Sequence, residues 1–196
     1  MKIIVIGAGA MGCLYGAYLS KHNDVTMLDV YEPQVENINQ NGITVLEEDS
    51  TEQHFSGIRA MKSGTCKEVA DLVIVFVKST HTESSLEENK GLFGENTLVM
   101  TLQNGAGNDR KIAKYVKTEN IIIGTSKHNS VNLGGGKIRH SGNGVTTIGS
   151  NLEENPHLQT VADLLTEAGF QSAVSDDIQR IIWSKLFVNL SINTFT

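Results

Sequence analysis

The sequence has only two cysteines and contains no long apolar run and no basic run. Two cysteines do not make a disulfide framework, and a reducing cytoplasm is therefore the expected location. No stretch approaches the roughly 18 apolar residues that a membrane-spanning helix needs. The net charge is −6 with both signs mixed along the chain, which argues against nucleic acid or an anionic membrane as a partner.

What the sequence does contain is an alternation of short apolar runs and helical patterns. Residues 3–6 and 71–77 are typical of buried parallel strands, and residues 11–21 have the spacing of an amphipathic helix. Strands that alternate with helices predict an α/β fold with a doubly wound, mainly parallel sheet. Further strands are expected at 24–29, 42–48, 97–102 and 120–124, and further helices at 33–40, 80–88 and 109–116, while 49–67 is polar and carries no clear pattern.

The pattern changes after residue 125. Residues 137–140 and 145–148 flank the turn-rich Ser-Gly-Asn-Gly at 141–144, which predicts a β-hairpin. A helix at 156–168, a strand at 171–174 and a long helix from 176 to 193 are expected to follow.

The apolar residues of the last helix have no later element in the sequence to pack against. We therefore expect the chain to be the N-terminal portion of a longer protein, with residues 1–175 forming one domain and 176–196 forming a separate helix. The alternative is that a partner completes the helix. A homodimer is a separate candidate assembly.

A glycine motif of the form G-x-G-x-x-G follows the first predicted strand and opens the first predicted helix. In that setting it predicts a Rossmann-type dinucleotide site, because the glycines allow a sharp turn, close approach of the backbone to a diphosphate and close helix packing. The helix N-terminus adds free N–H groups and partial positive charge. A tight turn that binds nothing is the alternative. The residues of the motif are Gly7, Ala8, Gly9, Ala10, Met11 and Gly12.

Asp29 closes the second predicted strand, at about the distance, roughly 20 residues, at which such folds place the acid that binds the adenosine ribose. A carboxylate there would repel a 2′-phosphate, and Val30 follows where a phosphate-binding site would use arginine. Asp29 therefore favours NAD over NADP, although Lys78 remains a candidate for attracting a phosphate. The alternative is an aspartate that only caps its strand.

Two polar groups follow the next strands of the expected sheet. Lys78 ends the strongest strand pattern and Asn104 ends the next, so both should face the crevice at the carboxyl edge of the sheet. The amide of Asn104 could pair with a carboxamide or a substrate oxygen. The alternative for each is a polar loop residue.

A polar row runs along the last predicted helix. Lys185, Asn189 and Asn193 are spaced four residues apart and share one face of an otherwise apolar segment. Buried amides need partners, which makes a polar ligand a candidate. A lysine that extends to water, with asparagines near a helix end, is the alternative.

These motifs together resemble the ketopantoate reductase family over essentially the whole chain. The resemblance lies in MKIIVIGAGAMG at the N-terminus, VK at 77–78, QNG at 103–105, GTSKH at 124–128 and GGGKIRHSGNGVTTIG at 134–149. The most specific match is IIWSKLFVNLSIN at 181–193.

Members of this family reduce a branched 2-keto acid to its 2-hydroxy acid on the route to pantothenate and coenzyme A, usually with NADPH. The resemblance implies that Lys185 is the general acid, that Asn189 and Asn193 hold substrate, and that Asn104 contacts both nicotinamide and substrate. It also places Lys78 and Ser130 near the cofactor, and it implies that 176–196 is the first helix of a helical C-terminal substrate domain that is otherwise absent. The sequence departs from the family at Asp29-Val30, where many members have an arginine that binds the 2′-phosphate of NADPH.

The resulting hypothesis is a reductase of a small 2-keto acid, 2-dehydropantoate above all, that uses NAD or NADP. Two alternatives stay open at this point. One is a related dehydrogenase of another hydroxy acid or an imine. The other is a nicotinamide-binding sensor without catalysis, which would not require the row formed by Lys185, Asn189 and Asn193.

Overall fold

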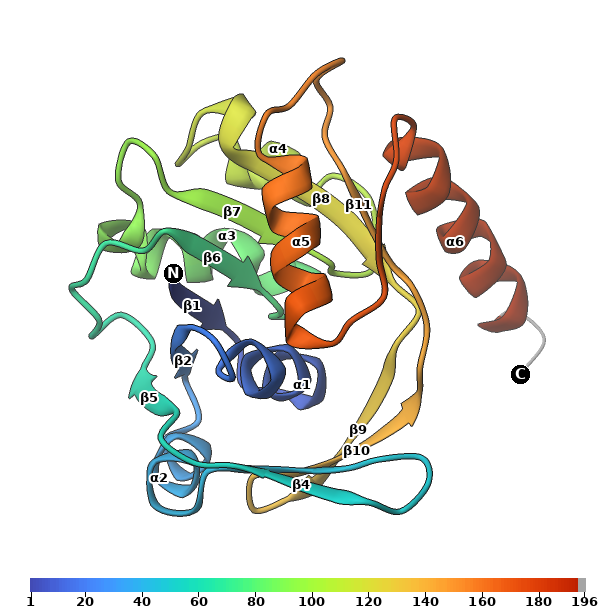
Figure 1. The fold of residues 1–196 in the computed structure, drawn as a ribbon. Coiled ribbons are helices and arrows are strands. Elements are labelled where there is room, and N and C mark those ends of the chain that lie inside the picture. Colours follow the sequence, from blue (N-terminus) through green and yellow to red (C-terminus); the bar gives the residue numbers. More distant parts are fainter. Residues whose placement is uncertain (194–196) are drawn as a thin grey trace.

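The protein is built around a twisted sheet that is parallel except for one strand pair (Figure 1). The computed structural model describes the backbone of residues 1–193 and the side chains of residues 1–188. Within them, β11 is antiparallel to β8 and the other neighbours in this sheet are parallel. The strand order is β12 (Ser172–Val174), β11 (Thr146–Gly149), β8 (Ile121–Ser126), β7 (Leu98–Thr101), β6 (Leu72–Val75), β1 (Lys2–Ile6), β2 (Asp24–Asp29) and β5 (Arg59–Lys62).

Alternate residues of each central strand face opposite sides of this sheet and build two cores. In β1, Ile3 and Val5 join the core beneath α1 and α5, whereas Ile4 and Ile6 join the core beneath α3 and α4. A strand that is buried on both faces has to be apolar throughout, which explains the continuous apolar runs. The helices are α1 (Ala10–Leu19), α2 (Glu32–Asn41), α3 (Thr82–Glu88), α4 (Asn108–Ile112), α5 (Leu158–Ala168) and α6 (Ile178–Asn193), with short 3₁₀ turns η1 (Ser79–His81), η2 (Lys90–Leu92) and η3 (Thr118–Asn120).

A second, four-stranded sheet lies beside α1 and α2 (Figure 1). Its residues Ile43, Val45 and Ile138 enter the same core as α1, so the two sheets are joined by apolar packing. The strand order is β4 (Glu52–Phe55), β3 (Ile43–Leu46), β10 (Lys137–Gly142) and β9 (Asn129–Gly134).

The prediction that residues 137–140 and 145–148 pair as a hairpin is wrong. β10 pairs with β9 and β3 in the small sheet, while β11 pairs with β8 and β12 in the large one. The turn that closes β9 and β10 is built by Gly134, Gly135 and Gly136, which all have positive φ. Gly144 instead passes against Lys127, where a Cβ would lie 2.6 Å from that side chain, and carries the chain from one sheet to the other.

The other local expectations are confirmed with small shifts of their ends, except that the helix expected at 109–116 stops at Ile112. The polar stretch 49–67, which carried no pattern, holds β4 and β5. The α/β Rossmann-type fold with a doubly wound, mainly parallel sheet is thus confirmed.

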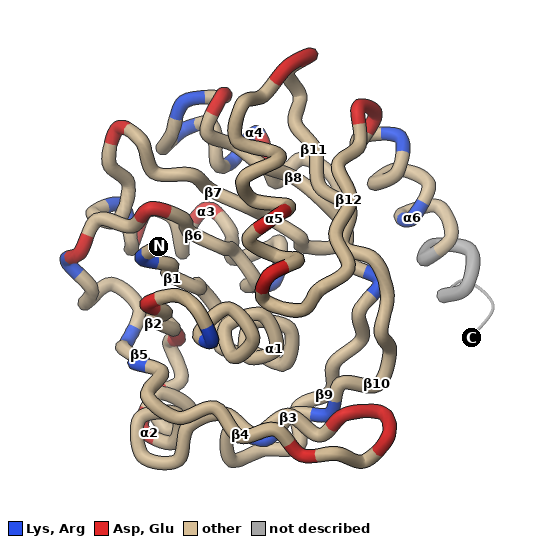
Figure 2. Tube along the Cα trace, in the orientation of Figure 1, with Lys and Arg blue, Asp and Glu red and all other residues tan. Residues whose placement is uncertain are grey.

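Charged positions of both signs are interspersed along the described chain (Figure 2). No helix in this part is long and apolar enough to cross a bilayer.

Candidate functional site

The turn between β1 and α1 is as sharp and as closely packed as its glycines predict. Gly7 has φ +103°, and a Cβ there would lie 3.0 Å from the backbone that follows β6. A Cβ on Gly12 would lie 1.8 Å from the carbonyl oxygen of Gly7, which no side chain can tolerate. These two glycines are therefore required by the fold itself.

Gly9 differs from them because a Cβ built on it meets no atom within 4 Å. It is the N-cap of α1, and the first backbone hydrogen bond of the helix runs from the Cys13 N–H to the Gly9 carbonyl. The N–H groups of Ala10, Met11 and Gly12 consequently have no partner within the helix. Open space beside free N–H groups at a helix N-terminus fits a bound diphosphate.

Asp29 holds this turn in place. One carboxylate oxygen accepts a hydrogen bond from the Ala8 N–H at 2.6 Å, and the other accepts one from the Tyr31 N–H at 2.9 Å. Asp29 therefore does cap its strand, and it also takes the Ala8 N–H away from any ligand. Each carboxylate oxygen has a second lone pair, so the capacity to accept ribose hydroxyls remains.

Asp29 and Gly9 also line a depression of about 540 Å³, here called the β2 cleft. Tyr31, Gln34 and Asn37 line it as well, and no lysine or arginine is among its described lining residues. The cleft therefore offers a carboxylate and uncharged polar groups to whatever binds there.

A second depression of about 410 Å³, the β6 cleft, lies at the carboxyl ends of β6 and β7. It brings together five of the expected site residues, which come from five separate segments of the chain. They are Met11, Lys78, Asn104, Ser130 and Lys185.

Lys185 reaches this cleft from α6, where it lies half-buried. Its Nζ donates a hydrogen bond of 2.7 Å to the carbonyl oxygen of Ser126 at the end of β8. Burial lowers the pKa of the Lys185 ammonium below its usual range, and the charge of Lys127 lowers the pKa further. A lysine with this environment gives up its proton more readily than an exposed one.

The other two members of the polar row fall outside the described side chains. Asn189 and Asn193 lie on α6, one and two turns beyond Lys185, so the backbone places all three on one face of the helix. Their roles remain predictions, as do those of the residues around the two clefts.

Sequence reasoning assigned no role to three residues that the fold brings to the β6 cleft. Gln103 donates to the carbonyl of Val77 and so ties the ends of β6 and β7 together. Ser126 anchors Lys185, and its Oγ accepts a hydrogen bond of 3.0 Å from the backbone N–H of His128. Gln103 stands in the QNG at 103–105 and the other two in the GTSKH at 124–128, which were the available signals.

Comparison with known proteins decides the family. The family profile described as ketopantoate reductase PanE/ApbA matches residues 3–153. The chain belongs to this family. Among curated ketopantoate reductase relatives, it is 32% identical over 196 residues to the 2-dehydropantoate 2-reductase of Streptococcus pyogenes serotype M1, covering 99% of this chain and 63% of that protein. It is also 32% identical to that of Halobacterium salinarum, covering 100% of this chain and 65% of that protein.

Solved structures show the same similarity. A 2-dehydropantoate 2-reductase from Geobacter metallireducens has a TM-score of 0.87 and 30% identity, with 96% of this chain and 62% of that one covered. A D-mandelate dehydrogenase solved with NADH and anilino(oxo)acetate has a TM-score of 0.88 and 28% identity, with 94% and 60% covered. The chain thus spans less than two thirds of the length of these ketopantoate reductase family members and structural neighbours.

Proposed function

We propose that this chain carries the nicotinamide-binding domain and the proton donor of a reductase that converts a small 2-keto acid, 2-dehydropantoate first, into its 2-hydroxy acid. The observation that supports this most directly is the convergence of Lys185 and Asn104 on one cleft beside the glycine turn. Residues 1–175 form the dinucleotide-binding domain in this proposal, and 176–196 begin the helical substrate domain.

The residues present fit a nicotinamide dinucleotide. The free N–H groups of Ala10, Met11 and Gly12 hold the diphosphate, and Asp29 accepts hydrogen bonds from the adenosine ribose. Asn104 and the neighbouring Lys78 and Ser130 contact the nicotinamide end in the β6 cleft. The bound cofactor supplies a hydride to the carbonyl carbon of the substrate.

Lys185 supplies the matching proton. Negative charge develops on the carbonyl oxygen as the hydride arrives, and an ammonium group beside that oxygen stabilises the charge. The Nζ–H bond then breaks and the proton goes to the oxygen, which gives the 2-hydroxy acid and a neutral lysine. Asn104, Asn189 and Asn193 hold the keto acid so that its carbonyl faces Lys185.

The test is an assay of NADH and NADPH consumption with 2-dehydropantoate and a panel of other 2-keto acids. A rate of reduction of 2-dehydropantoate well above the rates for the other acids supports the proposal as stated. The structural likeness to a D-mandelate dehydrogenase supports one alternative, an aryl or other branched 2-keto acid as the substrate. Cofactor binding without consumption by any acid would contradict both.

The lining of the β2 cleft supports NADH as the preferred cofactor, because no described lysine or arginine lines it and Asp29 repels a 2′-phosphate. Val30 lies next to Asp29 and is 70% exposed, so a longer side chain fits there. We expect Val30→Arg to improve the kcat/KM for NADPH by about tenfold, because a guanidinium pairs with the 2′-phosphate. Val30→Gln is the matched uncharged control, and an equal gain in that variant would contradict the explanation.

The pH dependence of turnover should follow the Lys185 ammonium. Reduction needs the protonated form, so turnover is present below the pKa of Lys185 and is lost as the pH rises through it. Because burial and Lys127 both lower this pKa, the loss should begin at lower pH than for an exposed lysine. Removal of the neighbouring charge in Lys127→Met should move the descending limb of the kcat profile to higher pH.

Lys67→Met is the control for this shift, since Lys67 is also exposed but lies away from the β6 cleft. Identical descending limbs in the wild type, Lys127→Met and Lys67→Met would show that another group controls the rate at high pH.

A further inference from the structure

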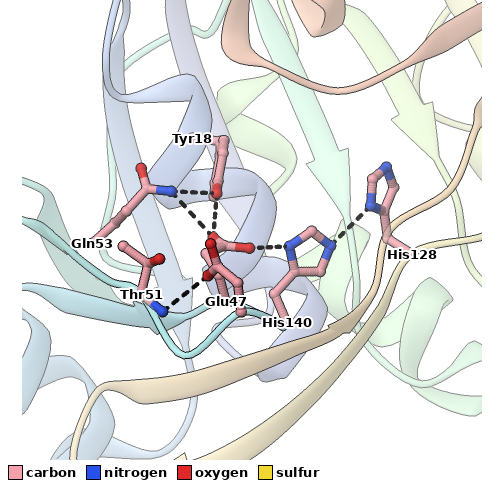
Figure 3. A network of polar contacts seen from close by, with 7 residues as sticks. Tyr18, Glu47, Thr51, Gln53, His128 and His140 are labelled. Carbon is pink, nitrogen blue, oxygen red and sulfur yellow. Dashed lines mark hydrogen bonds and ion pairs between the residues drawn. The ribbon is translucent and has the colours of Figure 1, made fainter.

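A line of hydrogen-bonded side chains runs from the β6 cleft into the small sheet (Figure 3). His128, which lines the cleft, places its Nδ1 3.0 Å from the Nε2 of His140 on β10. The Nδ1 of His140 lies 2.8 Å from the carboxylate oxygen Oε2 of Glu47, just after β3. Both imidazoles are buried, with 7% and 5% of their surface exposed.

The Glu47 carboxylate at the far end of this line has a fixed orientation (Figure 3). Its other oxygen, Oε1, accepts hydrogen bonds from the Tyr18 hydroxyl and from the Gln53 amide. Gln53 also donates to the Tyr18 hydroxyl at 3.0 Å, which closes a small ring of donors around that oxygen. Only Oε2 is therefore turned toward His140.

An ionised carboxylate can only accept. In the state in which His140 and His128 are both neutral, this sets the protons of the two rings in turn. His140 must carry its proton on Nδ1 to donate to Glu47, which leaves its Nε2 as an acceptor. His128 must then carry its proton on Nδ1 to donate to His140. The Nε2 of His128 is left as a bare acceptor.

That nitrogen is buried and has no hydrogen-bond partner among the described residues, while the His128 side chain lines the β6 cleft. A buried acceptor without a partner is unfavourable, so a donor from outside the chain would be stabilising there. Burial, and secondarily His140, lower the pKa of His128 to about 4, so this ring is uncharged at neutral pH. Edge contacts with Tyr15 and Phe170 fix the plane of the ring.

We propose that Glu47 is a positioning residue that acts through His140 to present His128 Nε2 as a hydrogen-bond acceptor for the nicotinamide dinucleotide. This inference rests on the proposed function, because it takes the dinucleotide as the occupant of the β6 cleft. The donor is a hydroxyl or amide N–H group of the nicotinamide riboside half, which carries both kinds. Ser130, on the same wall, has a buried hydroxyl that is also without a partner and lies opposite His140 in the strand pairing.

The substitution Glu47→Gln should reverse the donor and acceptor roles along this line of hydrogen bonds. Tyr18 and Gln53 both donate to the Oε1 position, so the amide oxygen of the new side chain stays there and its NH₂ group faces His140. His140 then has to accept at Nδ1 and donate from Nε2, which forces His128 to accept at Nδ1 and to carry its proton on Nε2. Nitrogen-15 NMR of the imidazoles at about pH 8.5, well above the ordinary histidine pKa of about 6.5, reports the position of each proton.

The same substitution should weaken NADH binding about tenfold, because an N–H group on His128 would face the donor of the ligand. Titration of NADH fluorescence measures this affinity. Glu48→Gln is the matched control, since it makes the same change in charge one residue away on an exposed side chain and should bind NADH as the wild type does.

His128→Phe removes the acceptor while keeping a ring of similar size. NADH affinity should fall by a similar factor, and adding Glu47→Gln to this variant should cause no further loss, because Glu47 acts only through His128. Thermal melts of all variants distinguish a loss of stability from a loss of NADH binding.

The outcomes separate the two proposals. If the wild type binds neither NADH nor NADPH, the proposed function fails and this inference fails with it. If the wild type binds NADH but Glu47→Gln binds equally well, the inference alone is overturned. A proton on Nε2 of His128 in the wild type, or unchanged proton positions in Glu47→Gln, also overturns it.

Discussion

Replacing Lys185 with alanine is expected to lower the turnover number for keto-acid reduction by about 10²- to 10⁴-fold, the usual contribution of a positioned general acid. The Lys185 side chain lines the β6 cleft and its Nζ donates to the Ser126 carbonyl, so its loss would remove both the proton and the positive charge that we propose for the substrate carbonyl oxygen. NADH affinity should change little, because the contacts proposed for the diphosphate and the adenosine lie elsewhere. Stopped-flow or steady-state kinetics with a parallel NADH titration measure both quantities.

Lys185→Arg separates the two roles of the lysine. Arginine keeps the positive charge but does not give up its proton at physiological pH, so KM should stay near that of the wild type while turnover remains low. Arg180→Ala is the matched control for Lys185→Ala, because it removes an exposed cation from the preceding part of α6. Turnover of Lys185→Ala within a few-fold of the wild type would remove the catalytic assignment.

The second large effect is a contrast between two glycines of the same turn. Gly12→Ala should destabilise the protein by about 3 kcal/mol or more, because overpacking against rigid backbone is costly and the new Cβ would lie 1.8 Å from the Gly7 carbonyl oxygen. Gly9→Ala should leave the melting temperature almost unchanged, since its Cβ meets no protein atom within 4 Å. It should nevertheless reduce NADH affinity strongly, because the Cβ occupies space proposed for the diphosphate.

Thermal melts and NADH titrations of the two variants test this contrast directly. Gly57→Ala provides a reference for an exposed turn glycine with positive φ and open space around it. Full NADH affinity in Gly9→Ala would place the diphosphate away from the glycine turn. The assignment of α1 as the diphosphate-binding helix would then fail.

Local patterns predicted the part of the fold that local forces determine. The apolar run at 3–6, the glycine turn and the helix after it follow from strand burial and backbone freedom at Gly7, which act over a few residues. The hairpin prediction failed because Ser-Gly-Asn-Gly at 141–144 has turn-forming residues in a segment that the tertiary structure uses as a crossing between sheets. The triple glycine at 134–136 made the turn instead.

The candidate site shows the same division. Gly9, Asp29, Lys78 and Asn104 could be singled out because each follows or ends a predicted strand, and the carboxyl ends of parallel strands share one edge. His128 lies four residues beyond its predicted strand, and only its place in the GTSKH motif at 124–128 marked it. Its significance depends on Glu47, which lies 93 residues from His140 in the sequence and meets it only because β3 pairs with β10.

The sequence by itself determined the class of fold, the glycine turn and the residue types available for chemistry, because these follow from short-range periodicity and backbone geometry. Only the tertiary structure decided that Asp29 accepts from the Ala8 N–H, that Lys185 donates to the Ser126 carbonyl 59 residues away, and that Glu47, His140 and His128 are joined by hydrogen bonds. Hydrogen bonds are directional and reach about 3 Å, so their partners are set by how the elements pack.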